Sequence, residues 1–457
     1  MNHEITCNSS GVRPARPSGN RSGGTATLRN LFPRTTMNTS LLLLLGCILS
    51  AWLVNTLTSL LDARNLSPTP PKGLEDIYDP DEYARSQRYT RAGLRFGALA
   101  ETWDTLLVAG FLLLGGFALA DELARQAAQA LGATGAWAET LTGLVFFAGL
   151  GLAHDLAGLP FALTHTFVLE ERFGFNRTTP ATFALDRLKG WLLAALIGGP
   201  LLAGILWLLR TFGPSAWIGC WAFAAVVSLL LVYVAPTWIL PLFNKFQPLE
   251  DQALRADIEA LASKEGFALS GLFVMDGSRR SAKGNAFFTG LGRGKRIALF
   301  DTLLEKLDRP EIVGVLAHEV GHWKLGHIRR SLVIGILRIG ALLWLLSLLL
   351  GWNALFTDLG LPASAHAGLA FFSLLFAPAS LLLGALTNAL SRRHEYQADR
   401  FAARATDAPL ALASALKKLV RQNLANLTPH PLSVALFHSH PPLADRLAAL
   451  NALAKTR

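Results

Sequence analysis

Residues 310–351 join a helix that carries two histidines to an apolar run of membrane-spanning length. They read PEIVGVLAHEVGHWKLGHIRRSLVIGILRIGALLWLLSLLLG. We expect a helix over 310–328 and a membrane span over 331–351, because about 20 mostly apolar residues cross a hydrocarbon core of about 30 Å. The histidine-bearing helix is therefore predicted to lie against a membrane.

Six more stretches are long and apolar enough to cross a bilayer. They lie at roughly 41–61, 102–120, 141–168, 190–210, 216–240 and 366–390. The chain as a whole has 457 residues, of which 51% are hydrophobic and only 16% charged, a composition typical of membrane proteins. The sequence thus predicts an all-α integral membrane protein with seven transmembrane helices. A lipoprotein signal at Leu41–Cys47 is less consistent with the sequence, because the apolar run continues to Leu61.

Lys and Arg are unevenly distributed between the two sides of these spans. On one side, segments 62–101, 169–189, 241–330 and 391–457 contain 6, 4, 14 and 10 of them, whereas the opposite loops contain only Arg125. Positive residues stay on the cytoplasmic side, so the long polar segment is predicted to face the cytoplasm, and residue usage suggests a bacterial inner membrane. Residues 1–36 carry five Arg on the wrong side, and we expect a disordered extension or a true start at Met37.

The net charge of +10 does not indicate nucleic-acid binding, because the basic residues lie in loops beside apolar runs rather than on one face with aromatics. The three cysteines, Cys7, Cys47 and Cys220, are far apart in the sequence. This spacing predicts neither a disulfide framework nor a thiolate zinc site. Any metal must therefore be bound by histidine and carboxylate.

Residues 241–330 form the longest polar insertion between spans. An amphipathic helix is predicted over 254–264 and strands over 271–275 and 297–300, while 62–101 resembles a surface connection followed by a short interfacial helix. We therefore divide the chain into the extension 1–36, a membrane domain over 37–240, and a metallopeptidase domain over 241–457 that includes the last two spans.

The string HEVGH places His318 and His322 on one face of a helix with Glu319 beside them. Two imidazoles at this spacing can bind one zinc ion, and Glu319 is then placed to act as general base on water. The alternative is an exposed helix with two surface histidines. It is disfavoured by the apolar residues that precede the string, which predict a covered helix: Ile312, Val313, Val315 and Leu316.

A catalytic zinc ion needs a third protein ligand. His327 follows His322 by five residues rather than the six of the HExxHxxGxxH pattern, so we do not assign it as a ligand. Glu395 is the better candidate, with Asp399 one helical turn later, placed to orient a ligand histidine. Alone, this acidic pair would be interpreted as salt-bridge partners for juxtamembrane arginines; together with HEVGH it predicts one Zn²⁺ per chain and a zinc endopeptidase.

These motifs closely resemble those of the CAAX prenyl protease 1 family, integral membrane zinc endopeptidases. The resemblance includes FGFNR at 173–177, LPLFNKF at 240–246, SAKGNAFFTG at 281–290 and HSHPPLADR at 438–446. It implies seven helices around a water-filled chamber with a cytoplasmic zincin-like α+β domain. It further implies zinc ligation by His318, His322 and Glu395, a general base at Glu319, and Asn285 and His440 as groups that bind the substrate backbone or oxyanion.

For several residues the sequence allows more than one interpretation. Asn285 also suits a turn after Gly284, and His440 also suits a local cap. Ionisable residues inside predicted spans either line the chamber or pair with each other, and they are His154, Asp155, His165 and Arg338. His394 departs from the aromatic residue usual in the family, and its position turns it away from the zinc face.

The expected partners are the lipid bilayer and a peptide or protein substrate that is prenylated or membrane-associated. Within the enzyme class, the alternative is a quality-control protease of the HtpX type, which has fewer spans. From another class, a transporter or scaffold with structural zinc is the alternative, but a closed structural site has no use for a free carboxylate at Glu319.

Overall fold

The computed structural model describes residues 37–289, 295–406 and 408–455. The expectations for residues 1–36 therefore lie outside the described residues. The helices of the first half are α1 (Thr39–Asn65), α2 (Pro80–Leu113), α3 (Gly116–Ala130), α4 (Gly135–Thr164), α5 (Pro180–Leu193), α6 (Gly199–Phe212), α7 (Ala216–Val234) and α8 (Leu240–Phe243). Those of the second half are α9 (Gln252–Glu265), α10 (Asp301–Leu304), α11 (Arg309–Lys324), α12 (His327–Leu350), α13 (Asn353–Asp358), α14 (Ala365–Leu375), α15 (Ala377–Ala405), α16 (Pro409–Gln422), α17 (Pro431–Phe437) and α18 (Leu443–Lys455).

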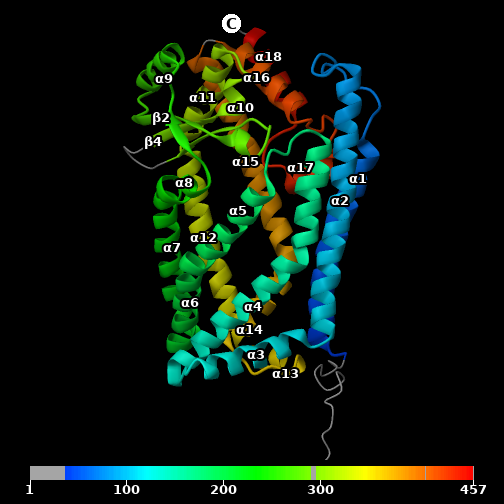
Figure 1. Cartoon of the computed structure of the whole chain (residues 1–457), viewed down its shortest axis with the longest axis vertical. Helices are drawn as coiled ribbons and strands as arrows, with labels where there is room; N and C mark the ends of the chain where they lie inside the picture. The colour runs from blue at the N-terminus through cyan, green and yellow to red at the C-terminus, as the bar shows by residue number, and fades with distance from the viewer. Residues whose placement is uncertain (1–36, 290–294, 407, 456–457) are drawn as a thin grey trace, which may run out of the picture.

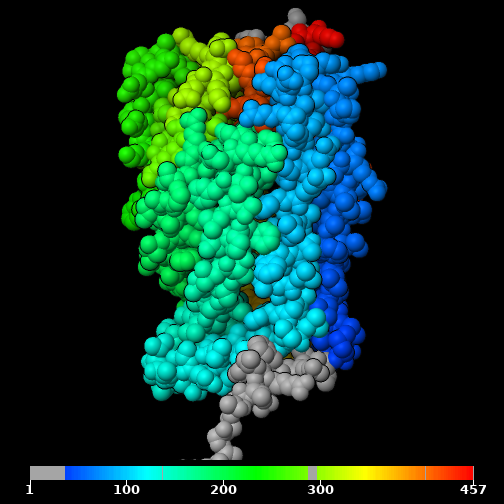
Figure 2. Space-filling model, turned by 45° about the vertical axis from the view of Figure 1, so that its right-hand side comes forward, coloured from blue at the N-terminus to red at the C-terminus, as the bar shows by residue number. Residues whose placement is uncertain are grey.

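Five helical runs in the described residues are long and apolar enough to cross a membrane, or six if the bent pair α14 and α15 counts as one span. They stand side by side as a tall bundle with the sheet and the C-terminal helices at one end (Figure 1; Figure 2). At most 22% of the most apolar window in any of the five lies buried inside the protein, as expected for side chains that face lipid. The protein is thus an integral, multi-pass membrane protein with a mostly helical fold.

The second span differs from the prediction of 102–120. Helix α2 already begins at Pro80, where the Asp79 side chain accepts a hydrogen bond from Glu82 N and caps the helix. It ends at Leu113, because Gly115 adopts a left-handed conformation with φ 73° that stops the helix. Helix α3 then runs across the end of the bundle (Figure 1). The short interfacial helix expected at the end of segment 62–101 is therefore the beginning of a 34-residue helix.

The last span, predicted at 366–390, is not one straight helix. Its two parts, α14 and α15, meet at an angle of 61° around Phe376. Pro378 lies in the first turn of α15, where its missing N–H and fixed φ are tolerated in a new helix but not inside a continuous one. The bend sets the direction of α15, whose far end reaches the sheet-bearing domain (Figure 1).

The polar insertion contains a four-stranded sheet in the order β1-β2-β4-β3. Its strands are β1 (Phe246–Pro248), β2 (Leu269–Met275), β3 (Ala286–Thr289) and β4 (Lys295–Phe300). β2 and β4 pair in parallel, and β1 and β3 flank them antiparallel. The predicted helix over 254–264 and strands over 271–275 and 297–300 are confirmed by α9, β2 and β4, whereas β1 was not predicted.

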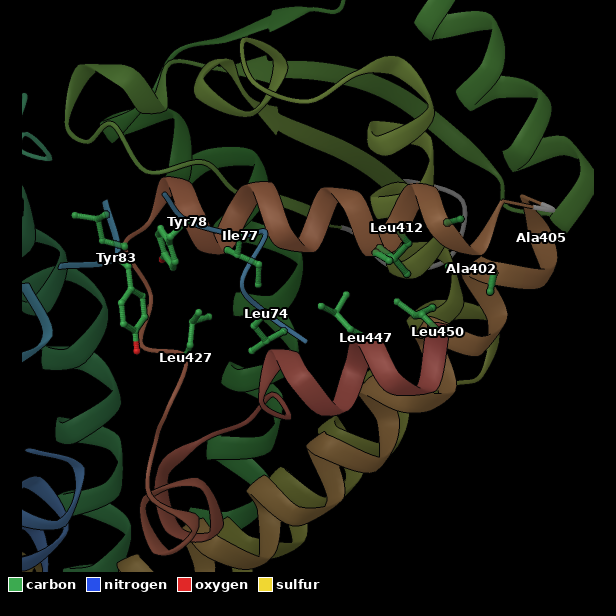
Figure 3. Close-up of a cluster of buried hydrophobic side chains, with 14 of the residues drawn as sticks. Leu74, Ile77, Tyr78, Tyr83, Ala402, Ala405, Leu412, Leu427, Leu447 and Leu450 are labelled. Atoms are coloured by element: carbon green, nitrogen blue, oxygen red, sulfur yellow. The ribbon is translucent and has the colours of Figure 1, made fainter. Parts of the chain in front are cut away.

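The segment between α1 and α2 is part of a hydrophobic core rather than a surface connection. Leu74 and Ile77 are each only 2% exposed. Figure 3 shows them between α16, which carries Leu412, and α18, which carries Leu447. The first polar segment therefore packs into the C-terminal domain and ties it to the membrane helices.

Candidate metal centre

Helix α11, which carries His318 and His322, has a strongly defined start. The Asp308 side chain and the N3 residue Glu311 form a reciprocal capping box, and Pro310 occupies the first turn. The buried Glu311 also accepts hydrogen bonds from Ser414 at 2.6 Å and Lys418 at 2.8 Å. The helix ends at Lys324 rather than at the predicted residue 328, because Gly326 adopts φ 71° and begins a turn into α12.

Helix α15 packs closely against α11 and brings Glu395 and Asp399 to it. Gly321, inside the HEVGH string, makes this close packing possible. A Cβ atom at this position would lie 2.9 Å from Phe401 Cδ1. The glycine between the two histidines therefore allows a helix from a distant part of the sequence to approach them.

His318, His322 and Glu395 converge so that one ligand atom from each lies within 4.8 Å of the others. His318 Nε2 is 3.1 Å from His322 Nε2 and 3.5 Å from Glu395 Oε2, and His322 Nε2 is 3.2 Å from Glu395 Oε1. Ligands at about 2.0–2.2 Å from a tetrahedral zinc ion stand roughly 3.3–3.5 Å apart. The buried Glu395 Oε2 has no hydrogen-bond partner among the described residues. The donor types, their spacing and this unsatisfied oxygen fit a zinc ion.

Asp399 and Arg446 lie behind this cluster. Asp399 Oδ1 is 2.8 Å from His318 Nδ1, the ring nitrogen that does not face the other ligand atoms. Arg446 donates to both Asp399 oxygens, at 2.8 and 2.6 Å, and its Nη1 is 3.4 Å from Glu395 Oε2. Asp399 is 1% exposed and Arg446 7%. A carboxylate at the outer nitrogen favours the His318 tautomer whose Nε2 is free to bind metal.

His322 is oriented by His327, which in turn stacks against His394. His327 Nδ1 lies 3.1 Å from His322 Nδ1, and its Nε2 is 2.9 Å from Gln397 Oε1. His394 stacks on His327 with ring centroids 4.0 Å apart, so it does not compete with Glu395. As expected, neither His327 nor His394 belongs to the group of three possible ligands.

The site is electronegative, and its pKa shifts reflect that. Burial alone would lower the pKa of His318, but hydrogen bonding to Asp399 and Glu395 outweighs it and raises the value to about 9. Burial raises the pKa of Glu319, and the nearby histidines offset this only in part. The two carboxylates at His318, Asp399 and Glu395, favour positive charge in this buried site, which is a requirement for binding a divalent metal.

The two residues assigned by resemblance to substrate binding are both exposed, and His440 lies next to the cluster. His440 Nε2 lies 3.6 Å from Glu395 Oε1, and its Nδ1 is 2.9 Å from Ser439 Oγ. Asn285 directly precedes β3, the sheet edge strand that contacts α11. β2 lies between β1 and β4, whereas β3 is an edge strand of the sheet.

Sequence reasoning missed three residues that organise this region: Arg446, Gln397 and Lys283. Lys283, two residues before Asn285, donates to Glu170 at 2.8 Å and to Tyr89 at 2.9 Å. It thereby ties the segment before β3 to helices of the membrane bundle. Arg446 and Lys283 both lie in strings already noted, HSHPPLADR and SAKGNAFFTG, but a one-dimensional pattern does not reveal which partners they meet.

Comparison with protein families gives two adjacent matches. Residues 61–245 match the CAAX prenyl protease N-terminal family of five membrane helices, and residues 248–454 match peptidase family M48. Together they cover most of the chain and identify a metal-dependent peptidase with a peptide or protein substrate.

The chain matches individual relatives over most of their length. The chain is 37% identical to the CAAX prenyl protease 1 homolog of Oryza sativa subsp. japonica, covering 84% of this chain and 90% of the relative. It is 33% identical to the human CAAX prenyl protease 1 homolog, covering 85% and 90%. These relatives are eukaryotic, so they give no support to the expectation of a bacterial inner membrane.

The fold also matches that of a solved structure over most of the chain. The crystal structure of S. mikatae Ste24p matches with a TM-score of 0.84 and 33% identity, covering 92% of this chain and 100% of the other. With both family regions, near-complete relatives and this structural match, the chain belongs to the CAAX prenyl protease 1 family of membrane metallopeptidases.

Proposed function

We propose that this chain is a zinc endopeptidase that cleaves near the C-terminus of prenylated CAAX proteins or peptides. The observation that carries the proposal is the convergence of His318, His322 and Glu395 at tetrahedral spacing on helices of a membrane protein. The substrate class is suggested by the relatives, which are named CAAX prenyl protease 1.

In this proposal the three converging residues hold one zinc ion per chain, and Asp399 orients His318. Bound zinc supplies Lewis acidity, which lowers the pKa of water and polarises a peptide carbonyl. Glu319 accepts a proton from water as the water oxygen bonds to the peptide carbon. Glu319 then delivers that proton to the leaving nitrogen as the C–N bond breaks. Its raised pKa suits the first step, because a more basic carboxylate accepts the proton more readily.

His440 and Asn285 bind the substrate in this proposal. Both are exposed, and each can donate an N–H to the carbonyl oxygen as negative charge develops there or to the substrate backbone. The substrate is proposed to lie extended along β3, where edge-strand hydrogen bonds fix its register.

The architecture supports seven crossings. A straight 64-residue helix would be roughly 96 Å long, three times the hydrocarbon thickness, and α6 packs back on α7 after a turn at Gly213–Ser215. Counting Pro180–Phe243 as two spans and the bent pair α14 and α15 as one gives seven. The Lys and Arg asymmetry supports a cytosolic position for the polar parts of the metal domain, residues 241–330 and 391–457, next to the membrane domain, residues 37–240. A bacterial inner membrane remains a proposal from composition alone.

Ionisable pairs within the helices favour a water-filled chamber between them. His154 lies 2.5 Å from Asp104, and both side chains are more than half exposed. Asp155 accepts two hydrogen bonds from Arg187, at 2.8 and 2.6 Å. Exposed charges at membrane depth require water or a polar lining rather than lipid.

The test compares a farnesylated CAAX peptide with its unmodified counterpart, using full-length protein with zinc measured in the same sample. Faster cleavage of the farnesylated peptide, abolished by a chelator and restored by zinc, supports the proposal. Equal cleavage of both would favour a quality-control protease. Stoichiometric zinc without any cleavage would favour a transporter or scaffold.

A further inference from the structure

A pocket of about 430 Å³ lies where the long helical run Pro180–Phe243 ends and the sheet begins. This volume falls within the usual range for small-ligand sites, about 300–1,000 Å³. Its walls come from the last turns of the membrane run and from β1, β2 and β4. α8 and the strands lie next to each other at this level in Figure 1. The pocket has no part in the metal centre.

The depth of the pocket corresponds to the membrane surface. Tyr233 and Trp238, in the turns just before it, are 64% and 75% exposed. Exposed Tyr and Trp at the end of a membrane helix mark the headgroup level of a bilayer. Leu242, within α8, is also half exposed. A lipid molecule can therefore reach this pocket from the bilayer.

One side of the pocket is formed by the sheet face opposite to the face that packs on α9 and α11. Ile297 and Leu299 point into the core shared with α9 and α11. Because side chains alternate along a strand, Arg296 and Ala298 lie on the opposite face, where Phe273 pairs with Ala298 in the register of β2 and β4. Phe273, Pro236, Leu240 and Pro241 give the pocket an apolar lining.

Two cations stand on this lining without a carboxylate partner. Among the described residues, Lys245 and Arg296 are exposed and neither side chain takes part in an ion pair. The Arg296 guanidinium lies 5.7 Å from the Phe273 ring centroid. The nearby Asp276 carboxylate accepts the backbone N–H of Lys245 at 2.7 Å.

A second acid close to the pocket, Asp186, is paired with a cation. Asp186 receives two hydrogen bonds from Arg280, at 2.7 and 2.9 Å. Lys189 adds a further positive charge, held by the Leu242 carbonyl at 2.7 Å. The mouth of the pocket therefore has an excess of positive charge beside an apolar wall, which suits an anion that carries an apolar chain.

We propose that this pocket binds one acidic phospholipid of the surrounding bilayer, with its phosphate at Lys245 and Arg296 and an acyl chain along Pro236 and Leu240. Each basic residue close to a membrane surface raises the affinity for anionic headgroups by about five-fold. The bound lipid would anchor the outer face of the sheet to the membrane. This inference does not depend on the proposed protease function.

The test is native mass spectrometry of delipidated full-length protein given equal amounts of phosphatidylglycerol and phosphatidylcholine. The protein should retain phosphatidylglycerol preferentially. The double variant Lys245→Gln/Arg296→Gln should lower that preference by roughly 25-fold, whereas Lys245→Arg/Arg296→Lys should keep most of it. Arg255→Gln is the matched control, because Arg255 lies 4.0 Å from Glu259 in another pocket of the same domain.

Three results would overturn the proposal. The first is an unchanged lipid ratio in the double variant, and the second is an equal loss in the Arg255→Gln control. The third is displacement of phosphatidylglycerol by millimolar inorganic phosphate, which would indicate a site for soluble anions. Metal content, measured on every variant, establishes that the protein has folded, because the metal ligands lie away from this pocket.

Discussion

Arg446 is the residue whose replacement most sharply tests how the metal centre is supported. We predict that Arg446→Met weakens metal binding even though Arg446 is not a ligand. Arg446 and its partner Asp399 are 7% and 1% exposed, so removing the guanidinium leaves a buried carboxylate without its charge partner. Breaking such a pair costs about 3–5 kcal/mol. Loss of a group that orients a metal ligand lowers metal affinity by about 10–100-fold.

The assay is chelator competition for zinc on full-length protein, with a thermal unfolding curve on the same sample. Lys417→Met is the control, because Lys417 pairs with an Asp76 side chain that is 64% exposed, and such surface pairs contribute about 0–1 kcal/mol. Arg446→Lys should be intermediate, since lysine keeps the charge but cannot donate to both oxygens in a fork. Wild-type zinc affinity in Arg446→Met, with no more thermal destabilisation than the control, would refute the reasoning.

Three further predictions concern the same site. Gly321→Ala should push α11 away from α15, which costs about 1–3 kcal/mol in packing and lowers zinc affinity. Gly335→Ala is the control, because a Cβ atom there meets nothing within 4 Å, and it should leave zinc affinity unchanged. Equal zinc affinities in the two variants would contradict this packing role. Glu395→Gln should reduce zinc content well below one per chain in metal analysis, and full zinc content would exclude Glu395 as a ligand. His440→Ala should keep zinc but lower kcat by about 10²–10³-fold in peptide cleavage, and an unchanged kcat would remove it from the oxyanion role.

The convergence of the metal cluster could be predicted because its chemistry fixes residue types and spacing. His318 and His322 share a helix face at i and i+4. Without a cysteine pair, the third ligand had to be a histidine or a carboxylate, and the spacing of His327 did not fit the known histidine pattern. Glu395 and Asp399 then followed from their own spacing. The structure places all of them together, with Asp399 at the outer nitrogen of His318.

The contacts that could not be predicted from the sequence depend on packing between distant segments. Arg446 meets Asp399 across 47 residues of sequence, and Lys283 meets Glu170 across 113. Leu74 and Ile77 looked like parts of a surface connection because their neighbours are polar and rich in proline, yet they fill a core between α16 and α18. No local periodicity marks such contacts.

The predicted boundaries of the membrane spans were wrong for a different reason. A hydropathy window locates apolar residues, whereas helix ends are set by backbone conformation and capping. Gly115 ends the second membrane helix well before its apolar run finishes, and Pro378 begins a new helix within the last one. A short edge strand such as β1, with three residues, is too brief for alternation to be recognised.

Zinc content and peptide cleavage, measured on one preparation of Glu319→Gln, test the proposed chemistry most directly. Glutamine preserves the shape of the side chain and leaves His318, His322 and Glu395 in place, but it cannot accept the proton from water. The variant should hold one zinc per chain and lose cleavage by about 10²–10⁴-fold or more. Cleavage within ten-fold of the wild type by zinc-loaded variant would contradict the assignment of Glu319 as the base.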